Sequence, residues 1–209
     1  MSLPIHLCYI TDRHGIAPMP LLPHLQAMAG AGVDLIQLRE KDLDSRALLG
    51  LVKSSVEAIR GTKTRIVVND RLDVAIAAGA HGVHLGGHSA PLEAILRHVP
   101  EDFLVGVSCH SIEEALKAEA GGADYILLGP TFDTPSKRLY GPPLGLNKLS
   151  EVADQVRIPL LALGGITVDR VRLCLDAGAT GIAGIRLFQE GPSPADRVRD
   201  LREQFRRRS

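Results

Sequence analysis

Eight short aliphatic runs, separated by longer amphipathic stretches, set the strongest limit on how this chain can fold. The runs are Ile5–Thr11, Leu35–Leu38, Arg65–Val68, Gly82–Leu85, Leu104–Ser108, Tyr125–Leu128, Leu160–Leu163 and Gly181–Ile185. Between them, apolar residues recur at the three- and four-residue intervals of helices, as in Arg46–Ile59, Leu72–Ala78, Ile112–Gly121, Val168–Ala177 and Pro194–Arg207. Continuous aliphatic runs are typical of parallel strands that helices cover. The pattern therefore predicts an α/β protein in which strands and helices alternate.

One short phrase recurs four times, each time just before a predicted strand. It reads AGVD from Ala31, AGAH from Ala78, GADY from Gly122 and AGAT from Ala177. Each copy places a glycine where a left-handed residue ends a helix. Reuse of one turn favours a closed, repeating (β/α)8 TIM barrel, a single domain over residues 1–209, although a doubly wound open sheet remains the alternative.

Charge and composition narrow the classes of function. Lys plus Arg and Asp plus Glu both number 24, so no overall field favours nucleic acid or an anionic membrane as a partner. The sequence contains no run of about 18 apolar residues that would span a membrane. We therefore expect a cytoplasmic protein whose affinity for phosphorylated small molecules is local. Composition leaves open whether it forms a homo-oligomer.

The cysteines and most histidines form no metal-binding pattern. Cys8, Cys109 and Cys174 are odd in number and lack CxxC spacing, which argues against a disulfide framework and a zinc site and fits a reducing cytoplasm. No HxH or HExxH motif supports a transition-metal site. Five histidines without a partner pattern are expected at the surface or in turns: His6, His14, His24, His81 and His98.

Polar residues that follow a strand are the candidates for chemistry, because the carboxyl ends of barrel strands meet at one face. After the second predicted strand, alternation puts Gln37, Arg39 and Lys41 on one side. Two cations and an amide would then face one space. These residues could bind a ligand, or the cations could form a structural ion-pair network with Glu40 and Asp42. The residues alone favour neither interpretation.

An amide and a carboxylate, Asn69 and Asp70, end the third predicted strand. Asp70 is placed to cap the helix that follows, a common use of aspartate. A carboxylate beside Arg39 and Lys41 could also hold Mg2+, which takes one or two carboxylates, waters and substrate phosphates. Both roles are compatible with the sequence.

The fifth predicted strand leads into Ser108, Cys109 and His110. Ser108 and His110 share one face and would point into the site, whereas Cys109 points toward the helices and packs there. Ser111 and Glu114 form a capping box for the next helix.

The longest loop follows the sixth predicted strand and carries Thr134, Ser136 and Lys137. Hydroxyls beside an ammonium group suit a pyrophosphate, although a solvated loop would have the same composition. Long loops in compact domains often bind ligands.

Two further loops follow the seventh and eighth predicted strands, where barrels of this kind recurrently bind phosphate. The first contains Gly164 and Gly165, whose backbone can approach a ligand closely. The second contains Ile185 and Arg186, and the guanidinium adds a forked donor. Together they predict a phosphate site.

Taken in order, these segments resemble the thiamine phosphate synthase family. The matching motifs are YITDR, QLREK, VND, GVHLG, GVSCH with EEA, GADYILLGPTFDTPSK, ALGGI and AGATGIAGI. They cover nearly the whole chain. The resemblance implies an enzyme that joins 4-amino-5-hydroxymethyl-2-methylpyrimidine diphosphate to 4-methyl-5-(2-hydroxyethyl)thiazole phosphate and releases pyrophosphate with Mg2+.

The resemblance also implies roles for particular residues. Asp70 would bind Mg2+, and Gly165 with Ile185 would bracket the thiazole phosphate. Arg39, Lys41 and Lys137 would oppose the charge of the leaving pyrophosphate. The residues that would hold the pyrimidine diphosphate are Gln37, Arg39, Lys41, Asn69, Ser108, Thr134, Ser136 and Lys137.

The chain departs from the family at one position. After GVHLG the family carries an acidic pair whose second carboxylate is the other Mg2+ ligand, but Ser89 stands there in this chain. The related thiazole tautomerases also lack that carboxylate, and a histidine matching His110 is their general acid and base. A synthase is the favoured hypothesis, a tautomerase is the alternative, and a non-catalytic binder of thiazole or thiamine phosphate is a third.

Overall fold

Eight parallel strands close into a barrel in the computed structural model, which describes residues 5–134, 142–191 and 193–206. The strands follow in chain order and close by pairing of β1 with β8. Their bounds are β1 Leu7–Ile10, β2 Leu35–Leu38, β3 Arg65–Asn69, β4 Gly82–Leu85, β5 Leu104–Cys109, β6 Tyr125–Leu128, β7 Leu160–Leu163 and β8 Gly181–Gly184. The predicted (β/α)8 barrel is confirmed, and the doubly wound sheet is wrong.

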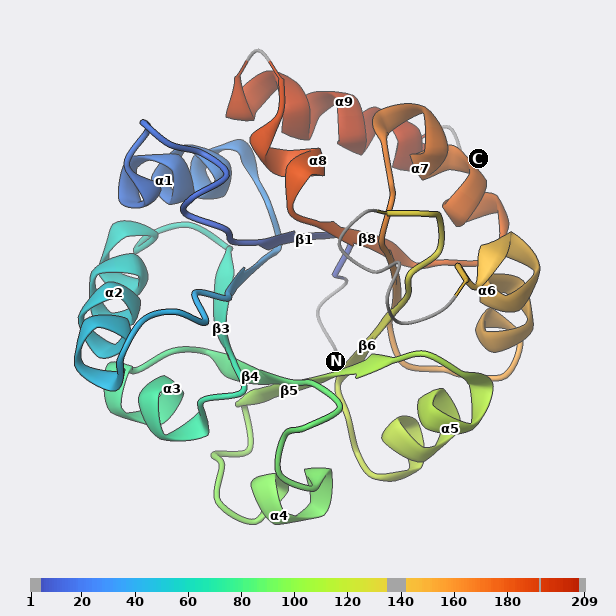
Figure 1. Ribbon diagram of the computed structural model, residues 1–209, viewed down its shortest axis with the longest axis horizontal. Helices are drawn as coiled ribbons and strands as arrows, with labels where there is room; N and C mark the ends of the chain where they lie inside the picture. Colours follow the sequence, from blue (N-terminus) through green and yellow to red (C-terminus); the bar gives the residue numbers. More distant parts are fainter. Residues whose placement is uncertain (1–4, 135–141, 192, 207–209) are drawn as a thin grey trace.

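Helices surround the barrel on its outer side (Figure 1). Their bounds are α1 Leu21–Ala31, α2 Ser45–Ala58, α3 Leu72–Ala78, α4 Leu92–Leu96, α5 Ile112–Ala120, α6 Gly145–Ala153, α7 Val168–Asp176, α8 Arg186–Gln189 and α9 Pro194–Arg206. Among the described residues, no helix has the length and apolar character that crossing a bilayer requires.

The repeated glycine turn is confirmed at all four predicted positions. The φ angles are 96° at Gly32, 70° at Gly79, 93° at Gly122 and 96° at Gly178. Each of these glycines lies between the end of a helix and the strand that follows it. A left-handed residue ends the helix at these points, and glycine adopts this conformation without the steric cost of a Cβ.

Buried apolar side chains pack on both faces of the sheet, in one cluster inside the barrel and two outside it. One buried cluster consists of strand residues and their immediate neighbours, including Cys8, Val67 and Leu127, and it fills the barrel interior. A larger cluster joins the other strand faces to the helices, and it contains Tyr9 and Cys109. The prediction that Cys109 packs toward the helices is confirmed, and burial raises the pKa of its thiol to about 12.

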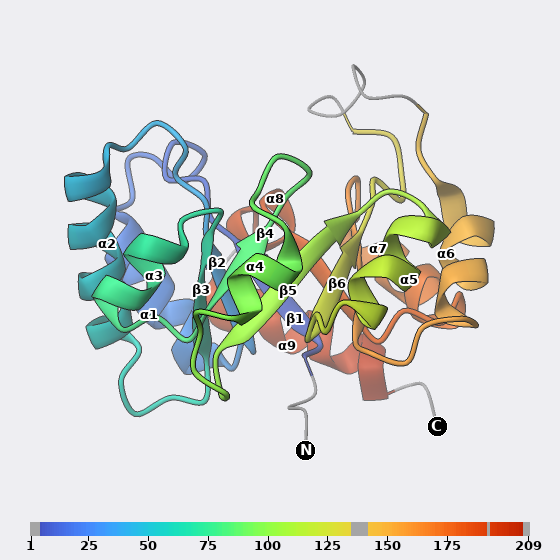
Figure 2. The same ribbon diagram turned by 90° about the horizontal axis from the view of Figure 1, so that it is seen from below.

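Two strands end one residue earlier than the sequence predicts, β1 at Ile10 and β8 at Gly184. The Thr11 hydroxyl donates to the Glu40 carboxylate in the loop after β2. Ile185 has helical dihedral angles because α8 begins directly after it. The loops that follow β4 and β6 lie on the same side of the barrel (Figure 2).

His24 is buried, contrary to the prediction that it lies at the surface. It belongs to the apolar stripe of α1, with Leu21, Leu25 and Met28 at helical spacing. Its ring packs edge-on against Tyr9, with ring centroids 5.4 Å apart. Neither ring nitrogen has a hydrogen-bond partner within the described part of the chain. Burial lowers the pKa of His24.

This burial makes stability depend on pH. Because the folded pKa of His24 lies below its unfolded value of about 6.5, the unfolded chain binds the extra proton and stability falls as pH falls through 6.5. We predict that His24→Phe removes this loss, so that its free energy of unfolding gains on wild type by up to about 1.4 kcal/mol per pH unit below that point. Urea unfolding at pH 7.5 and 5.5 measures the difference. The exposed His98→Phe is the control, and an equal gain in both variants would contradict the prediction.

Candidate active site

The loop after β2 is held by a buried carboxylate. Glu40 is 5% exposed and accepts hydrogen bonds from the Thr11 hydroxyl at 2.6 Å and from the Arg13 guanidinium at 3.0 Å. Thr11 in turn accepts the backbone N–H of Arg39 at 3.0 Å. Asp42 also pairs with Arg13. The predicted ion-pair network of Glu40 and Asp42 with Arg39 and Lys41 is therefore wrong, because Arg13 is their partner.

Within the described residues, Arg39 and Lys41 form no ion pair, so their charges remain available at the mouth. Arg39 is half-buried and Lys41 is exposed. Each cation lies close enough to influence another polar group: Lys41 favours the ionised form of Asp70, and Arg39 disfavours protonation of His84. The structure thus brings together the cations after β2 and the polar ends of β3 and β4.

A row of hydrogen bonds joins Gln37, Asn69 and Asp70. In this row, each group decides whether the next one donates or accepts. A carboxylate only accepts, so the Asn69 amide nitrogen donates to Asp70 at 2.7 Å. The Asn69 oxygen therefore accepts from the Gln37 amide nitrogen, at 2.9 Å. This leaves the Gln37 Oε1 atom as a buried acceptor with no partner among the described residues. A ligand that donates a hydrogen would satisfy it.

Asp70 does not cap α3, so that interpretation is wrong. Arg71 is the residue before the helix, and no side chain caps it. Asp70 instead has a φ of 61° and accepts from the Gly86 N–H at 3.2 Å and from the Ser89 hydroxyl. Partial burial opposes ionisation, but hydrogen bonds from Ser89, Gly86 and Asn69 and the charge of Lys41 outweigh it and lower the pKa of Asp70.

Ser108 and His84 meet inside the barrel. The Ser108 hydroxyl lies 2.8 Å from His84 Nε2, and Tyr125 Oη lies 3.1 Å from His84 Nδ1. His84 is 1% exposed, and burial, with a smaller contribution from Arg39, lowers its pKa to about 4. Sequence reasoning assigned no role to His84 or Tyr125, because each sits inside an apolar run. The missing information was their register, which aligns both with Gly106 on β5, the strand between them.

His110 is exposed beyond the end of β5, where its Nδ1 contacts the carbonyl oxygen of Gly129. A carbonyl only accepts, so Nδ1 carries a hydrogen and Nε2 is the ring nitrogen that the contact leaves free. Ser111 caps α5 by accepting the Glu114 N–H at 3.2 Å, as predicted. The Glu114 carboxylate accepts the N–H of His110, one residue earlier than a capping box requires.

The loops after β6 and β7 pack tightly on each other. Thr131 N–H donates to the Leu163 carbonyl at 2.7 Å, and Phe132 N–H donates to the Gly164 carbonyl at 3.0 Å. A Cβ on Gly164 would lie 2.7 Å from Pro130, and one on Gly165 would lie 2.6 Å from the Asp133 carbonyl oxygen. These glycines are required first by loop packing, and their contact with phosphate stays a prediction.

Arg170 supports the same loops, and sequence reasoning missed it. Its guanidinium donates to the Gly165 carbonyl at 2.9 Å and lies 4.8 Å from the centre of the Phe132 ring. Ile185 is half-buried and Arg186 is exposed at the start of α8, so both lie on the strand-end side as predicted. Thr134 is buried. Ser136 and Lys137 lie outside the described residues.

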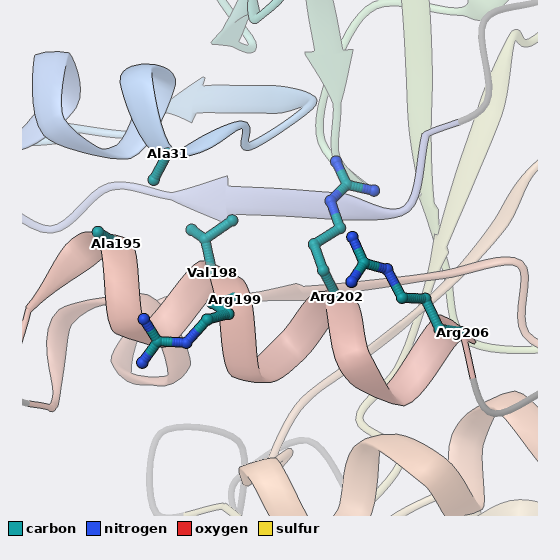
Figure 3. A pocket seen from close by; sticks show the side chains of 6 residues that line it. All are labelled: Ala31, Ala195, Val198, Arg199, Arg202 and Arg206. Carbon is teal, nitrogen blue, oxygen red and sulfur yellow. The ribbon is translucent and has the colours of Figure 1, made fainter.

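A hollow of about 340 Å³ lies away from this mouth, between α1 and α9 (Figure 3). Arg202 lines it and donates to the Gly32 carbonyl and to Asp34, in the turn that precedes β2. This turn lies at the opposite end of the barrel from the loops that follow the strands. Among the described residues, no cluster of three or more His, Cys, Asp or Glu side chains is arranged to hold a metal ion.

The fold and the polar groups at its mouth place the chain among the (β/α)8-barrel enzymes. A family model described as thiamine monophosphate synthase matches residues 7–188. The chain belongs to this family.

Individual relatives agree with the family. A thiamine-phosphate synthase of Methanoculleus marisnigri is 44% identical over 177 residues, covering 85% of this chain and 84% of the relative. One of Roseiflexus castenholzii is 38% identical over 192 residues, covering 92% and 84%. The solved structure of thiamine phosphate pyrophosphorylase from Pyrococcus furiosus has a TM-score of 0.87 at 32% identity, covering 98% of this chain and 96% of that chain.

The buried hydroxyl of Thr11 links the Glu40 carboxylate to the backbone of Arg39. We predict that Thr11→Val lowers the free energy of unfolding by about 1–3 kcal/mol, because it leaves buried polar groups unpaired. It also weakens the binding of inorganic pyrophosphate, because Arg39 loses its support. Thr64→Val is the matched control, since Thr64 is equally buried but donates only to the Val33 carbonyl. Urea unfolding and calorimetric titration measure both, and equal loss of pyrophosphate binding in the two variants would contradict the role of Thr11.

Proposed function

We propose that this chain, as one domain over residues 1–209, is a thiamine-phosphate synthase. It would couple hydroxymethylpyrimidine diphosphate with hydroxyethylthiazole phosphate to give thiamine phosphate and pyrophosphate. The observation that carries the proposal is the unpartnered Gln37 Oε1 on β2, the strand that leads directly to Arg39 and Lys41. A buried acceptor suits the exocyclic amine of an aminopyrimidine, and the neighbouring cations suit its diphosphate.

The residues of the chain would act mainly on the leaving group. As the bond between the pyrimidine methylene and the diphosphate oxygen breaks, its electron pair leaves with pyrophosphate. Arg39 and Lys41 would oppose this growing negative charge, and Lys137 would have the same role by resemblance to the family. The electron-rich aminopyrimidine carries the positive charge on the methylene. The thiazole nitrogen then attacks that carbon and forms the new C–N bond.

The residues at Asp70 fit a magnesium ion held partly by the substrate. The carboxylate is ionised at neutral pH because its pKa is lowered, and the Ser89 hydroxyl lies against it. Mg2+ in phosphate sites commonly takes one or two carboxylates, with waters and substrate phosphates completing its shell. When bound there, Mg2+ would neutralise part of the diphosphate charge.

The binding partners of the enzyme would be phosphorylated small molecules. The three cysteines are free and buried, which supports a reducing, cytoplasmic location.

One observation favours a second candidate function, that of a thiazole tautomerase. His110 is exposed at the mouth, and its Nδ1 donates to the Gly129 carbonyl, so that Nε2 is the ring nitrogen left to face a ligand. Such a ring can move a proton near neutral pH. This chemistry needs neither a pyrophosphate leaving group nor Mg2+. The two activities therefore differ in their response to EDTA.

We predict that the protein forms thiamine phosphate with Mg2+, and that Arg39→Ala and Lys137→Ala each lower the rate by about a hundredfold or more. Each variant removes a charge that opposes the leaving group. A coupled assay for pyrophosphate release measures the rate, and the exposed Lys53→Ala on α2 is the control for loss of one charge. Isomerisation of thiazole carboxylate phosphate that survives EDTA and is lost in His110→Ala, with no thiamine phosphate at any Mg2+ concentration, would overturn the synthase in favour of the tautomerase.

A second prediction concerns the position where the family carries a carboxylate. With Asp70 as the one carboxylate, half-maximal activity should need a high Mg2+ concentration. Ser89→Asp should lower that concentration about tenfold, because a second carboxylate strengthens binding of a hard cation. Ser89→Asn, similar in size but uncharged, is the matched control. The same Mg2+ requirement in Ser89→Asp and wild type would remove Asp70 and residue 89 from the metal site.

A further inference from the structure

Three residues form a row across neighbouring strands inside the barrel. His84 of β4 is the register partner of Gly106 of β5, which is the partner of Tyr125 of β6. A Cβ on Gly106 would overlap the ring and hydroxyl of Tyr125. Because Gly106 has no side chain, the tyrosine lies across β5 and reaches His84 on the strand beyond it.

A continuous hydrogen-bonded chain runs from this row to the barrel mouth. Tyr125 Oη lies 3.1 Å from His84 Nδ1, and His84 Nε2 lies 2.8 Å from Ser108 Oγ. Tyr125 and His84 are fully buried, whereas Ser108 is half-buried near the end of β5. The last group of the chain is therefore the one that a ligand at the mouth can reach.

The chain has one favoured direction. Among the described residues, His84 Nδ1 is the hydrogen-bond partner of the Tyr125 hydroxyl, and a buried hydroxyl hydrogen needs an acceptor. Tyr125 therefore donates to Nδ1. A neutral imidazole then carries its hydrogen on Nε2 and donates it to Ser108 Oγ. The hydrogen of Ser108 then cannot point back toward His84, which leaves it free to donate to a ligand at the mouth.

We propose that His84 and Tyr125 are positioning residues that hold the Ser108 hydroxyl as a hydrogen-bond donor toward the diphosphate of the bound substrate. This inference rests on the proposed function, because the acceptor is the substrate anion. A serine hydroxyl that rotates freely presents its lone pairs to an anion part of the time, and an anion only accepts. A donor fixed before the reaction needs no reorganisation as negative charge grows on the leaving group.

The first test removes the Tyr125 hydroxyl, which determines which nitrogen of His84 carries the hydrogen. In Tyr125→Phe the ring remains, but His84 is free to donate from Nδ1 or Nε2 and Ser108 can donate back to it. We expect kcat for thiamine phosphate formation to fall about tenfold while KM for the thiazole phosphate stays unchanged. Tyr9→Phe is the matched control, because Tyr9 is equally buried but lies on the helix side of the sheet, hydrogen-bonded to Gln189. Equal losses of kcat in the two variants would assign Tyr125 a packing role and overturn the proposal.

A double-mutant cycle tests whether Tyr125 acts through Ser108. If it does, Tyr125→Phe has no further effect on kcat in the Ser108→Ala background, because the group that it orients is gone. If the double variant instead lost kcat by the product of the two single-variant losses, as independent sites do, the proposal would be overturned.

A spectroscopic test does not depend on turnover. In protein carrying ¹⁵N-labelled histidine, the His84 ring should show an unprotonated Nδ1 and a protonated Nε2, with the signals assigned by their absence in His84→Gln. Tyr125→Phe should convert this to a mixture of tautomers. Protonation at Nδ1 in wild type would overturn the positioning role and leave the synthase proposal intact. If wild type formed no thiamine phosphate, the proposed function would fail. The positioning role of His84 and Tyr125 would still be supported by an Nε2–H tautomer in wild type together with weaker pyrophosphate binding in Tyr125→Phe.

Discussion

Closure of the sheet is the constraint on which the rest of the structure depends. Once β8 pairs with β1, water reaches the interior only at the two ends of the barrel, so a polar atom inside needs a partner from another strand or from a ligand. Side chains of the described interior meet much of this need by bonding across strands: Gln37 of β2 donates to Asn69 of β3, and Tyr125 of β6 bonds His84 of β4. Both rows of hydrogen bonds end at the mouth, because the interior there is open to a ligand.

One of these two hydrogen-bonded rows of side chains ends in an acceptor, and the other ends in a donor. The carboxylate of Asp70 can only accept, so the amides that follow it leave Gln37 Oε1 as an acceptor. The hydroxyl of Tyr125 has to donate, so the groups that follow it make Ser108 a donor. An aminopyrimidine diphosphate carries a donor on its ring and acceptors on its phosphates. If the proposed function holds, the mouth would be complementary to the two ends of this one molecule before it binds.

Several residues that look functional in the sequence are first explained by support of the loops. Gly164 and Gly165 allow the β6 and β7 loops to approach closely, and Arg170 ties the same loops together. Glu40 is buried and bonded to Thr11 and Arg13, which frees the cations on either side of it for the mouth. Support and function are coupled here, since a loop that carries a charge acts only from a defined position.

The sequence by itself determined eight strands and five of the helices, each to within two residues, together with the four glycine turns and the side of the barrel on which polar residues gather. These features depend on local backbone preference and on the period of apolar residues, both of which can be read within a few positions. Only the tertiary structure decided that Tyr125 crosses Gly106 to His84, that Arg13 rather than Arg39 pairs with Glu40, and that Asp70 bonds Ser89 instead of capping α3. Each of these contacts joins residues brought together by strand register or loop packing, and register is set by closure of the whole barrel, which no local segment contains.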